Sequence, residues 1–453
     1  TEKAKDLVRM AVAKVRLVEP LQRKSLALNP DALVIGAGLS GMTAALELAD
    51  QGFQVSLVEK QAELGGNMRH LHFLYNDLDP RSFLDEVIRR TQGHPNIHLF
   101  TGAQVQSFEG GVGKFQSTLS FSNGHADMVI NHGITILATG GQPYQPTEYL
   151  YGQDADVLTQ IELEEQLAHS PQVFQDMKSV VMIQCVGSRN QERPYCSRLC
   201  CNQAIKNSLE LKRINPNLEV FVLYRDIRTY GLQEKYYRQA RQAGVVFLRF
   251  DEHDPPLVFR DGQAKVLVHD CMLDSDMVLD ADRVILSVAT IAQPDAKDVA
   301  QLLKVPLTPD GFFQEAHMKL APVDFATEGI YLCGLAHYPK KAINESMVQS
   351  IAAAGRAAAV LSQQAIDIEP TISQVVEEKC DGCAYCVDPC PYNAITLVEY
   401  QDENGQIKKR VVVDESSCKG CGTCQATCPK NAIFVWHFKL DQLRAMTMAA
   451  LEN

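Results

Sequence analysis

Two copies of one cysteine pattern near the C-terminal end constrain this chain more than any other feature. The copies occupy residues 380–391 and 418–429, and each reads Cys-x2-Cys-x2-Cys-x3-Cys-Pro. In this spacing three thiolates of one copy bind a [4Fe–4S] cluster, and the fourth cysteine binds the cluster of the other copy. The predicted ligand sets are Cys380, Cys383, Cys386 and Cys428 for one cluster, and Cys418, Cys421, Cys424 and Cys390 for the other.

Zinc is the alternative metal for such cysteines, but zinc sites usually pair CxxC units. The tandem runs therefore favour iron–sulfur chemistry and the transfer of single electrons. Between them, residues 394–400 and 410–414 read as strands on either side of a turn at 402–405, which predicts an antiparallel hairpin. A C-terminal α+β ferredoxin domain with two [4Fe–4S] clusters is the expected structure.

Composition and charge narrow the remaining possibilities. At 453 residues the chain exceeds one hydrophobic core and should divide into several units. No apolar run approaches the roughly 18 residues that span a bilayer, so no transmembrane segment is expected. The net charge of −12 argues against nucleic acid as a partner. Fourteen cysteines, mostly in motifs, favour metal ligation in a reducing cytoplasm over a disulfide framework.

A glycine-rich turn near the N-terminal end has the context of a dinucleotide site. A strand at 31–36 leads into Gly36-x-Gly38-x-x-Gly41, a helix follows at 42–51, and a second strand at 54–58 ends in Glu59. The three glycines would make the turn, admit a pyrophosphate and pack the helix on the strand. The helix N-terminus would receive the phosphate charge, and the acid would hold the ribose hydroxyls.

Three further segments favour FAD over NAD. Gly65-Gly66 follows the acid, residues 138–141 (Ala-Thr-Gly-Gly) end a strand at 134–137, and residues 329–334 precede a helix at 342–361. The N-terminus of that helix would stabilise negative charge on a reduced flavin. Lys340 and Lys341 at its start either add to this charge or are simply solvated. The predicted cofactor contacts are Gly36, Gly38, Ser40, Gly41, Glu59, Lys60, Gly65, Gly66, Ala138, Thr139, Gly140, Gly334 and Lys341.

Residues 142–289 lie where a second nucleotide domain is expected, yet the turn after the strand at 179–184 has no glycine finger. NAD(P)H is therefore not expected to bind there. The turn instead contains Cys185, Cys196, Cys200 and Cys201, for which we prefer a third [4Fe–4S] cluster over a redox disulfide or buried thiols.

Several other residues carry weaker signals. The loop 225–231 is expected either to be solvated or to face the flavin or the third cluster. Cys271 and Cys333 are isolated and are expected to be ordinary buried cysteines. No histidine has ligand spacing, and His70, His72 and His337 are flavin neighbours only as an alternative to simple packing or exposure.

The domain layout follows from these segments, and the fold class is α/β with a C-terminal ferredoxin domain. The predicted units are an N-terminal helix and connection (1–30), a discontinuous FAD-binding domain (31–141 plus 290–361), an inserted α/β domain (142–289), a linker (362–378), the ferredoxin domain (379–440) and a C-terminal helix (441–453).

The order of these motifs closely resembles the A-type subunits of heterodisulfide reductase over essentially the whole chain. The resemblance includes residues 2–11 and 310–313. It implies a thioredoxin-reductase-like, two-dinucleotide-domain fold with bound FAD and a cluster on the four-cysteine set. Family members often carry a further N-terminal domain with another cluster. It is not in this sequence, either by truncation, by missing order or because the chain is of a shorter type.

The resemblance also implies a cytoplasmic hub for electrons. A hydrogenase- or dehydrogenase-linked subunit would supply electron pairs, which the flavin would divide between ferredoxin and B- and C-type subunits that reduce a disulfide or thioester. Such complexes are expected to be homodimers of heteromers. Three alternatives stay open: a wiring module without bifurcation, a self-contained NAD(P)H-dependent oxidoreductase, and a disulfide reductase using Cys200 and Cys201 as a dithiol.

Overall fold

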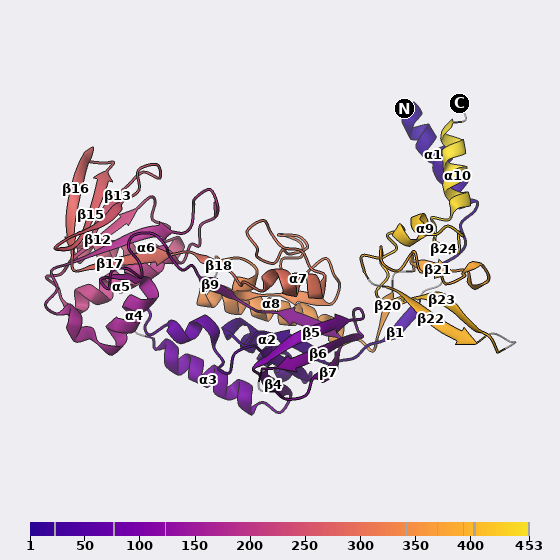
Figure 1. Cartoon of the computed structure of the whole chain (residues 1–453), viewed down its shortest axis with the longest axis horizontal. Coiled ribbons are helices and arrows are strands. Elements are labelled where there is room, and N and C mark those ends of the chain that lie inside the picture. Colours follow the sequence, from indigo (N-terminus) through magenta and orange to yellow (C-terminus); the bar gives the residue numbers. More distant parts are fainter. Residues whose placement is uncertain are drawn as a thin grey trace.

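A computed structural model describes residues 1–21, 24–75, 78–122, 124–339, 342–368, 370–392, 394–401 and 405–451. The molecule is elongated, with three parts in a row (Figure 1). An inserted α/β part lies at one end, a part built on the first glycine-rich turn lies in the middle, and the cysteine-rich part lies at the other end. Two terminal helices project from the cysteine-rich part.

The middle part is built on a parallel sheet of order β19-β8-β2-β3-β4. All of its strands except the edge strand β4 are nearly continuous runs of buried, mostly apolar residues, because both faces are covered. Val34 faces the helices α2, α3 and α8, and the next residue back, Leu33, faces an antiparallel sheet on the opposite side. The bounds are β2 (Ala32–Ile35), β3 (Val55–Glu59), β4 (Ile97–Thr101), β8 (Ile134–Leu137), β19 (Ile330–Leu332), α2 (Leu39–Asp50), α3 (Pro80–Gly93) and α8 (Ile343–Leu361).

The opposite face of that sheet carries the antiparallel sheet β5-β6-β7 and the helix α7, and the short pair β9-β18 leads to the inserted part. The bounds are β5 (Ala103–Glu109), β6 (Phe115–Phe121), β7 (Met128–His132), β9 (Gly141–Pro143), β18 (Thr290–Ala292) and α7 (Ala296–Leu303). The chain therefore leaves and re-enters the middle part beside one point, at the paired strands β9 and β18.

The inserted part repeats the layered arrangement. Its parallel sheet has the order β10-β17-β11-β12-β13, with helices on one face and the antiparallel sheet β14-β15-β16 on the other. The bounds are β10 (Val157–Thr159), β11 (Ser179–Val186), β12 (Glu219–Tyr224), β13 (Val246–Arg249), β14 (Leu257–Asp261), β15 (Gln263–Asp270), β16 (Ser275–Ala281), β17 (Arg283–Val288), α4 (Gln160–His169), α5 (Cys200–Ile214) and α6 (Glu234–Gln242).

The cysteine-rich part has little apolar core, and its cysteines pack with Ile395, Val411 and Ile433. Its hairpin β22-β23 is antiparallel, as the sequence predicts, although residues 402–404 of the turn lie outside the described residues. The bounds are β1 (Lys24–Ala27), β20 (Ala365–Ile368), β21 (Ser373–Val375), β22 (Ile395–Gln401), β23 (Ile407–Val413), β24 (Ile433–Val435) and α9 (Thr423–Thr427). Strands β20 and β21 lie within the segment predicted as a linker.

The two terminal helices, α1 (Glu2–Val15) and α10 (Leu440–Leu451), pack against each other. Gln442 Nε2 donates to the carbonyl of Leu17, and the ammonium of Lys14 lies 4.1 Å from the ring centre of Phe438. The single-turn helices are η1 (Gly66–His70), η2 (Pro171–Phe174), η3 (Gly231–Gln233), η4 (Gly334–Ala336) and η5 (Glu377–Lys379). None of the described helices combines the length and apolar character needed to cross a bilayer.

One cysteine prediction is wrong. Cys333 is buried as expected, but Cys271 is exposed. Cys271 begins the turn between β15 and β16, and that turn extends into solvent. An isolated cysteine in a sequence gives no information about such a hairpin tip, so the general tendency of cysteine to be buried was misleading here.

Candidate functional site

The glycine-rich turn between β2 and α2 leaves a space that a side chain would fill. Gly36 has φ +101°, and a Cβ there would lie 2.5 Å from the carbonyl oxygen of Ala138. A Cβ on Gly41 would lie 1.7 Å from the carbonyl oxygen of Gly36, so the helix packs directly on the turn. Gly38, by contrast, has no atom within 4 Å of its Cβ position. The open side of the turn therefore faces the N-terminus of α2, where a phosphate group fits.

The glycine pair after β3 closes one edge of this space. Gly65 forms a β-bridge with Gly38, and its N–H donates to the carbonyl of Ala37 at 2.9 Å. A Cβ on Gly66 would lie 3.3 Å from the Cα of Gly38. Glu59 is buried at the end of β3, and its Oε2 accepts from the N–H of Ala37 at 2.7 Å. This acid thus holds the turn, and its contact with a ribose stays a prediction.

Lys60 behaves differently from its neighbours in the predicted set. Its Nζ lies 3.0 Å from Oδ2 of Asp295, and both side chains are more than a third exposed. A surface ion pair of this kind contributes little stability. This contact ties β3 to the start of α7, and the predicted role of Lys60 at the cofactor stays a prediction.

The segment after β8 supplies a polar group with no partner. Thr139 Oγ1 is buried and makes no hydrogen bond, which is costly unless a ligand atom completes it. Gly140 has φ +75° and open space at its Cβ position. Asn67 Nδ2 donates to the carbonyl of Gly141 at 2.8 Å and joins this segment to η1. The residues present therefore fit a bound dinucleotide such as FAD.

The predicted flavin segment at residues 329–334 meets the glycine-rich turn at the N-terminus of α2. Gly334 has φ +71°, and a Cβ there would lie 2.3 Å from Oγ of Ser40. The Gly334 N–H donates to Oε1 of Gln349 at 2.9 Å, and Gln349 Nε2 lies 2.7 Å from Nδ1 of His337. His337 Nε2 in turn lies 2.8 Å from Oε2 of Glu315. Since the amide donates to Nδ1, the ring carries its proton on Nε2, and this buried network fixes the loop.

The start of α8 connects this loop to the inserted part. Glu345 accepts from the N–H of Ala342 at 2.9 Å, closing the first turn of the helix, and also pairs with Arg198. Lys340 and Lys341 lie outside the described residues, so their predicted role stays a prediction. The network of Gln349, His337 and Glu315 was not identified from the sequence, because its members are separated along the chain.

The four cysteines of the inserted part come together at the end of β11. Cys185 has φ +64° near the end of the strand, and Cys200 and Cys201 are the first residues of α5. Burial raises the pKa of the Cys200 thiol well above its usual value, and the nearby thiols of Cys201, Cys185 and Cys196 raise it further. Four thiols that oppose one another's ionisation at a helix N-terminus are a donor set that fits a bound cationic metal group.

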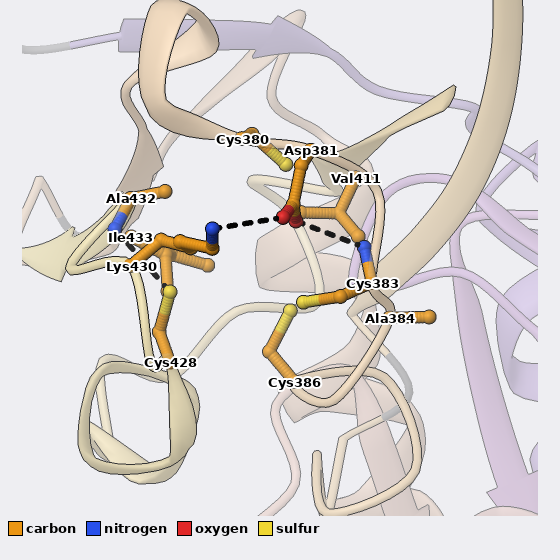
Figure 2. Close-up of a pocket in the computed structure, with 10 residues that line it drawn as sticks. All are labelled: Cys380, Asp381, Cys383, Ala384, Cys386, Val411, Cys428, Lys430, Ala432 and Ile433. Carbon is orange, nitrogen blue, oxygen red and sulfur yellow. Dashed lines mark hydrogen bonds and ion pairs between the residues drawn. The ribbon is translucent and has the colours of Figure 1, made fainter. Parts of the chain in front are cut away.

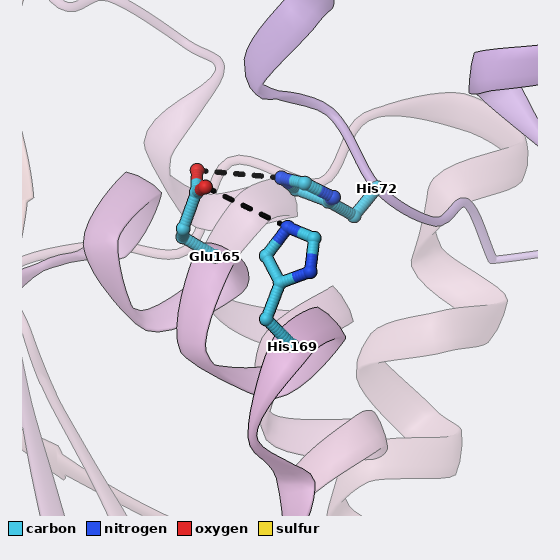
Figure 3. A group of neighbouring side chains, drawn as sticks. All are labelled: His72, Glu165 and His169. Atoms are coloured by element: carbon cyan, nitrogen blue, oxygen red, sulfur yellow. Dashed lines mark ion pairs between the residues drawn. The ribbon is translucent and has the colours of Figure 1, made fainter.

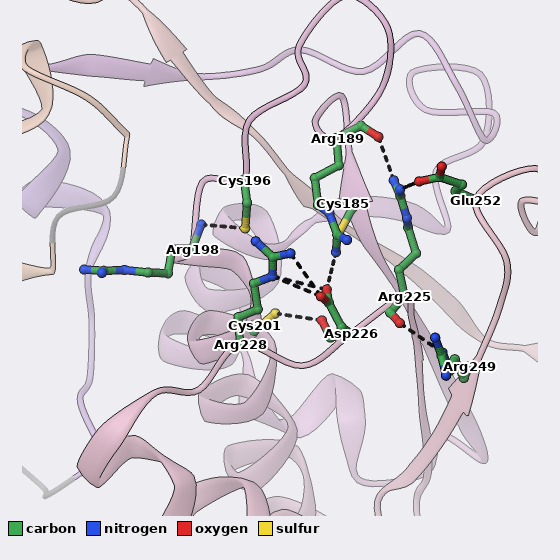
Figure 4. Close-up of polar contacts among 10 residues, drawn as sticks. All are labelled: Cys185, Arg189, Cys196, Arg198, Cys201, Arg225, Asp226, Arg228, Arg249 and Glu252. Carbon is green, nitrogen blue, oxygen red and sulfur yellow. Dashed lines mark hydrogen bonds and ion pairs between the residues drawn. The ribbon is translucent and has the colours of Figure 1, made fainter.

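Arg189 and Arg228 lie beside this cysteine set, whereas the side chain of Arg198 points away from it (Figure 4). Arg189 Nη1 lies 3.9 Å from Cys185 Sγ, and the N–H of Arg198 donates to Cys196 Sγ at 3.3 Å. Both Arg189 and Arg228 pair with Asp226. The loop 225–231 therefore faces the cysteines at its first residues, whereas its Tyr230 is exposed. Cationic groups here would offset the negative charge of four thiolates.

One set of C-terminal cysteines lines a pocket that both motifs build (Figure 2). Cys380, Cys383 and Cys386 come from the first motif, and Cys428 comes from the second. The N–H of Ala432 donates to Cys428 Sγ at 3.2 Å. Burial is the largest cause that raises the pKa of Cys386 to about 11, so a metal is needed to hold it as a thiolate. The structure thus brings together the first of the two predicted ligand sets.

The second set lies against the middle part of the molecule. Ser373 donates its N–H to Cys418 Sγ at 3.4 Å, and its hydroxyl lies 3.1 Å from Cys424 Sγ. Cys421 Sγ is exposed and lies 3.5 Å from the Thr423 hydroxyl.

Cys390 of the first motif packs in the same apolar cluster as Cys424, and the N–H of Ala394 donates to its Sγ at 3.4 Å. Burial lowers the pKa of Lys304, which follows α7, and the Cys390 thiolate opposes that effect. Lys304 Nζ also donates to the carbonyl of Tyr392 at 3.0 Å. The cysteine-rich part is therefore joined to the middle part beside Cys390.

Comparisons with known proteins agree with this architecture. Residues 379–432 match the family described as 4Fe-4S dicluster domain, and residues 34–83 match the NAD(P)-binding Rossmann-like domain. The structure superimposes on thioredoxin reductase of Lactococcus lactis with a TM-score of 0.52 and 15% sequence identity, covering 73% of this chain and 98% of that one. The fold is thus a thioredoxin-reductase-like α/β fold with a C-terminal dicluster domain, which confirms the predicted fold class.

Longer relatives define the family. The chain is 35% identical to an iron–sulfur A-type subunit of CoB–CoM heterodisulfide reductase from Methanopyrus kandleri, over 88% of this chain and 74% of the relative. It is 33% identical to the A-type subunit of the H2:CoB–CoM heterodisulfide,ferredoxin reductase from Methanothermobacter marburgensis, with the same coverage. The chain belongs to the family of heterodisulfide reductase A-type subunits, which are oxidoreductases, as its sequence motifs predicted.

Proposed function

We propose that this chain is the FAD-containing electron-transfer subunit of a heterodisulfide-reductase-like complex and carries three [4Fe–4S] clusters. One observation carries the proposal: a dinucleotide cradle lies between two regions of clustered cysteines. A flavin exchanges electrons in pairs or singly, whereas each cluster carries one electron at a time. A chain with this order of sites can connect two-electron transfer to one-electron transfer.

The residues of the cradle have distinct roles in this proposal. The turn at Gly36–Gly41 and the N-terminus of α2 would hold the pyrophosphate, with Glu59 at the ribose and Thr139 Oγ1 completing a contact to the cofactor. The N-terminus of α8 would favour negative charge on the flavin ring. The hydrogen bonds from Gly334 through Gln349 to His337 would keep the backbone beside the ring in one conformation.

The contacts between parts suggest two routes for single electrons. One runs to the C-terminal set that contains Cys390, beside Lys304 and the ion pair of Lys419 with Glu328 at 2.9 Å. The other runs to the inserted four-cysteine set, because Arg198 contacts both Cys196 and Glu345 at the start of α8. Two routes leaving one flavin are the arrangement that electron bifurcation requires, so we include bifurcation in the proposal.

The relatives' names supply the partners of the proposal. They mention dihydrogen or formate, ferredoxin and the CoB–CoM heterodisulfide. As partners in the cytoplasm we propose ferredoxin, B- and C-type subunits and a hydrogenase- or dehydrogenase-linked subunit, in a homodimer of heteromers. The terminal acceptor would be a disulfide or a thioester. We also propose the division into units at residues 31–141 plus 290–361, 142–289 and 379–440.

The structure of the inserted part argues against the alternative that this chain is a self-contained NAD(P)H-dependent oxidoreductase. In the described residues 142–289, the turn after β11 carries cysteines, and α5 begins at Cys200 without a glycine finger before it. No site for a second pyrophosphate is therefore built there.

Iron analysis and redox titration of the anaerobically purified protein test the proposal. About twelve irons per chain are expected, four for each of three clusters. If the flavin bifurcates, its two one-electron potentials should be crossed, with an unstable semiquinone. Uncrossed potentials with a stable semiquinone would favour the alternative of electron transfer without bifurcation. Rapid reduction of the isolated chain by NADH would overturn the assignment as a subunit that depends on partners. A count of about eight irons would remove the third cluster and restore the dithiol alternative.

A further inference from the structure

A group of two histidines and a carboxylate lies where the inserted part meets the middle part (Figure 3). His72 follows η1 of the middle part, and Glu165 and His169 lie one turn apart on α4 of the inserted part. His72 Nε2 is 3.4 Å from Glu165 Oε2, and His169 Nε2 is 3.6 Å from Glu165 Oε1. All three ligand atoms lie within 4.8 Å of one another.

Each nitrogen–oxygen separation is close to that between two ligands of a tetrahedral cation, with the two histidines on different oxygens of Glu165. Two ligands at about 2.0–2.1 Å from zinc, at the tetrahedral angle, are about 3.3–3.4 Å apart. We propose that His72, Glu165 and His169 bind one divalent cation of the zinc class. The cation would link the inserted part to the middle part. Two histidines and one carboxylate leave the fourth position for water.

The position of His72 is fixed without a metal. Its backbone N–H donates to Glu164 Oε1 at 2.9 Å, and Glu164 is completely buried and pairs with Lys206 at 2.6 Å. Lys206 Nζ also donates to the carbonyl of Phe73 at 3.0 Å. The loop that carries His72 is therefore held against α4 and α5, so binding would order little of the chain. Glu165 and His169 are more than half exposed, which gives an ion access from solvent.

One group opposes the cation. Arg81 Nη2 lies 3.3 Å from both ring nitrogens of His72. Equal separations place the guanidinium over the face of the ring, away from the in-plane lone pair of either nitrogen. The charge of Arg81 still repels a cation bound at Nε2. The site is thus predicted to bind more tightly when this charge is removed.

The alternative is a simple pair of surface contacts between Glu165 and the two histidines, with no metal. The two possibilities differ in a titration of the holoprotein, with flavin and clusters intact, after dialysis against a chelator. Zinc is added as Zn²⁺ alone, and binding is followed by calorimetry and by the zinc-to-iron ratio after dialysis. We expect one zinc per chain in the wild type.

Single-residue variants distinguish zinc bound at this site from zinc bound by the cluster cysteines. Glu165→Gln and His169→Ala should each weaken zinc binding at least about tenfold, whereas Arg81→Gln should tighten it. His253→Ala is the matched control, because His253 is an exposed histidine 3.7 Å from the carboxylate of Glu252. Iron and flavin contents must equal those of the wild type. Absence of zinc from the wild type, or retention of equal binding by Glu165→Gln and His169→Ala, would overturn the proposal.

Discussion

Replacing Glu164 by leucine should destabilise the inserted part strongly, because it leaves a buried ammonium without its counter-ion. The side chains of Glu164 and Lys206 are 0% and 7% exposed. Burial is the main cause that lowers the pKa of Lys206, and Glu164 opposes that shift. Removing one partner of a buried pair costs about 3–5 kcal/mol. The variant Glu164→Leu also loses the acceptor for the His72 N–H.

The assay is thermal unfolding of the holoprotein with its cofactors bound. For a unit of about 150 residues, each kcal/mol shifts the midpoint by about 2–4 °C, so Glu164→Leu should lower it by about 6–20 °C. The double variant Glu164→Leu with Lys206→Met removes both charges and should recover most of that loss, since an apolar pair of similar size is often neutral or better. The matched control is Lys206→Met alone, which leaves the carboxylate buried and unpaired.

The pH dependence gives an independent check of the same argument. Without Glu164, the pKa of Lys206 in the folded protein falls further below its unfolded value. The unfolded chain then binds more protons than the folded one, so stability rises with pH until the unfolded value of about 10.4 is passed. The deficit of Glu164→Leu should therefore shrink at alkaline pH. A deficit that is constant with pH, or a double variant no more stable than Glu164→Leu, would refute the reasoning.

Three further outcomes are expected. Cys386→Ser and Cys428→Ser should abolish the same cluster signal in electron paramagnetic resonance, and Cys390→Ser should abolish the other. If Cys390→Ser instead abolished the same signal as Cys386→Ser, the crossed ligand sets would be wrong. Gly41→Ala should prevent FAD retention, measured by absorbance after gel filtration, because its Cβ would lie 1.7 Å from the preceding turn's carbonyl oxygen; full flavin content would contradict the cradle. Burial lowers the pKa of His132 to about 4; the stability that its neutral ring provides is complete above pH about 6.5 and is lost as pH falls toward 4, about 3 kcal/mol in total. His132→Asn should flatten this acid-side loss in denaturant titrations, and an unchanged slope would assign it to other groups.

Local patterns made much of the fold predictable. The strand at 134–137 was placed at its observed bounds, and the strands and helix around the first glycine-rich turn differ from prediction by a few residues. Such elements are readable because apolar runs and glycines act over short distances along the chain. The segment predicted as a linker contains β20 and β21, whose partners β1 and β24 lie far away in the sequence. Short strands of this kind are stabilised by pairing rather than by their own residues.

The residues of the candidate site likewise include some that the sequence predicted and some that it did not. Spacing alone identified the cysteines and glycines, since a cluster or a phosphate requires those residue types at fixed intervals. It did not identify Arg189 and Arg198 beside the inserted cysteines, or the contact of Lys304 near Cys390. Arg189 and Lys304 are ordinary charges in the sequence, and the fold places them near sulfur. Arg198 contacts Cys196 through its backbone N–H, while its guanidinium pairs with Glu345.

The sequence by itself determined the chemistry of this protein: which residues can hold metal clusters, where a dinucleotide fits, and to which family the chain is related. The tertiary structure decided the geometry that joins those sites. It placed His337 between Gln349 and Glu315. It also left Thr139 Oγ1 without a hydrogen-bond partner beside the glycine-rich turn and placed Arg198 between the inserted cysteines and α8. The physical reason is that ligand type and backbone freedom are properties of single residues, whereas proximity arises only when distant segments pack together.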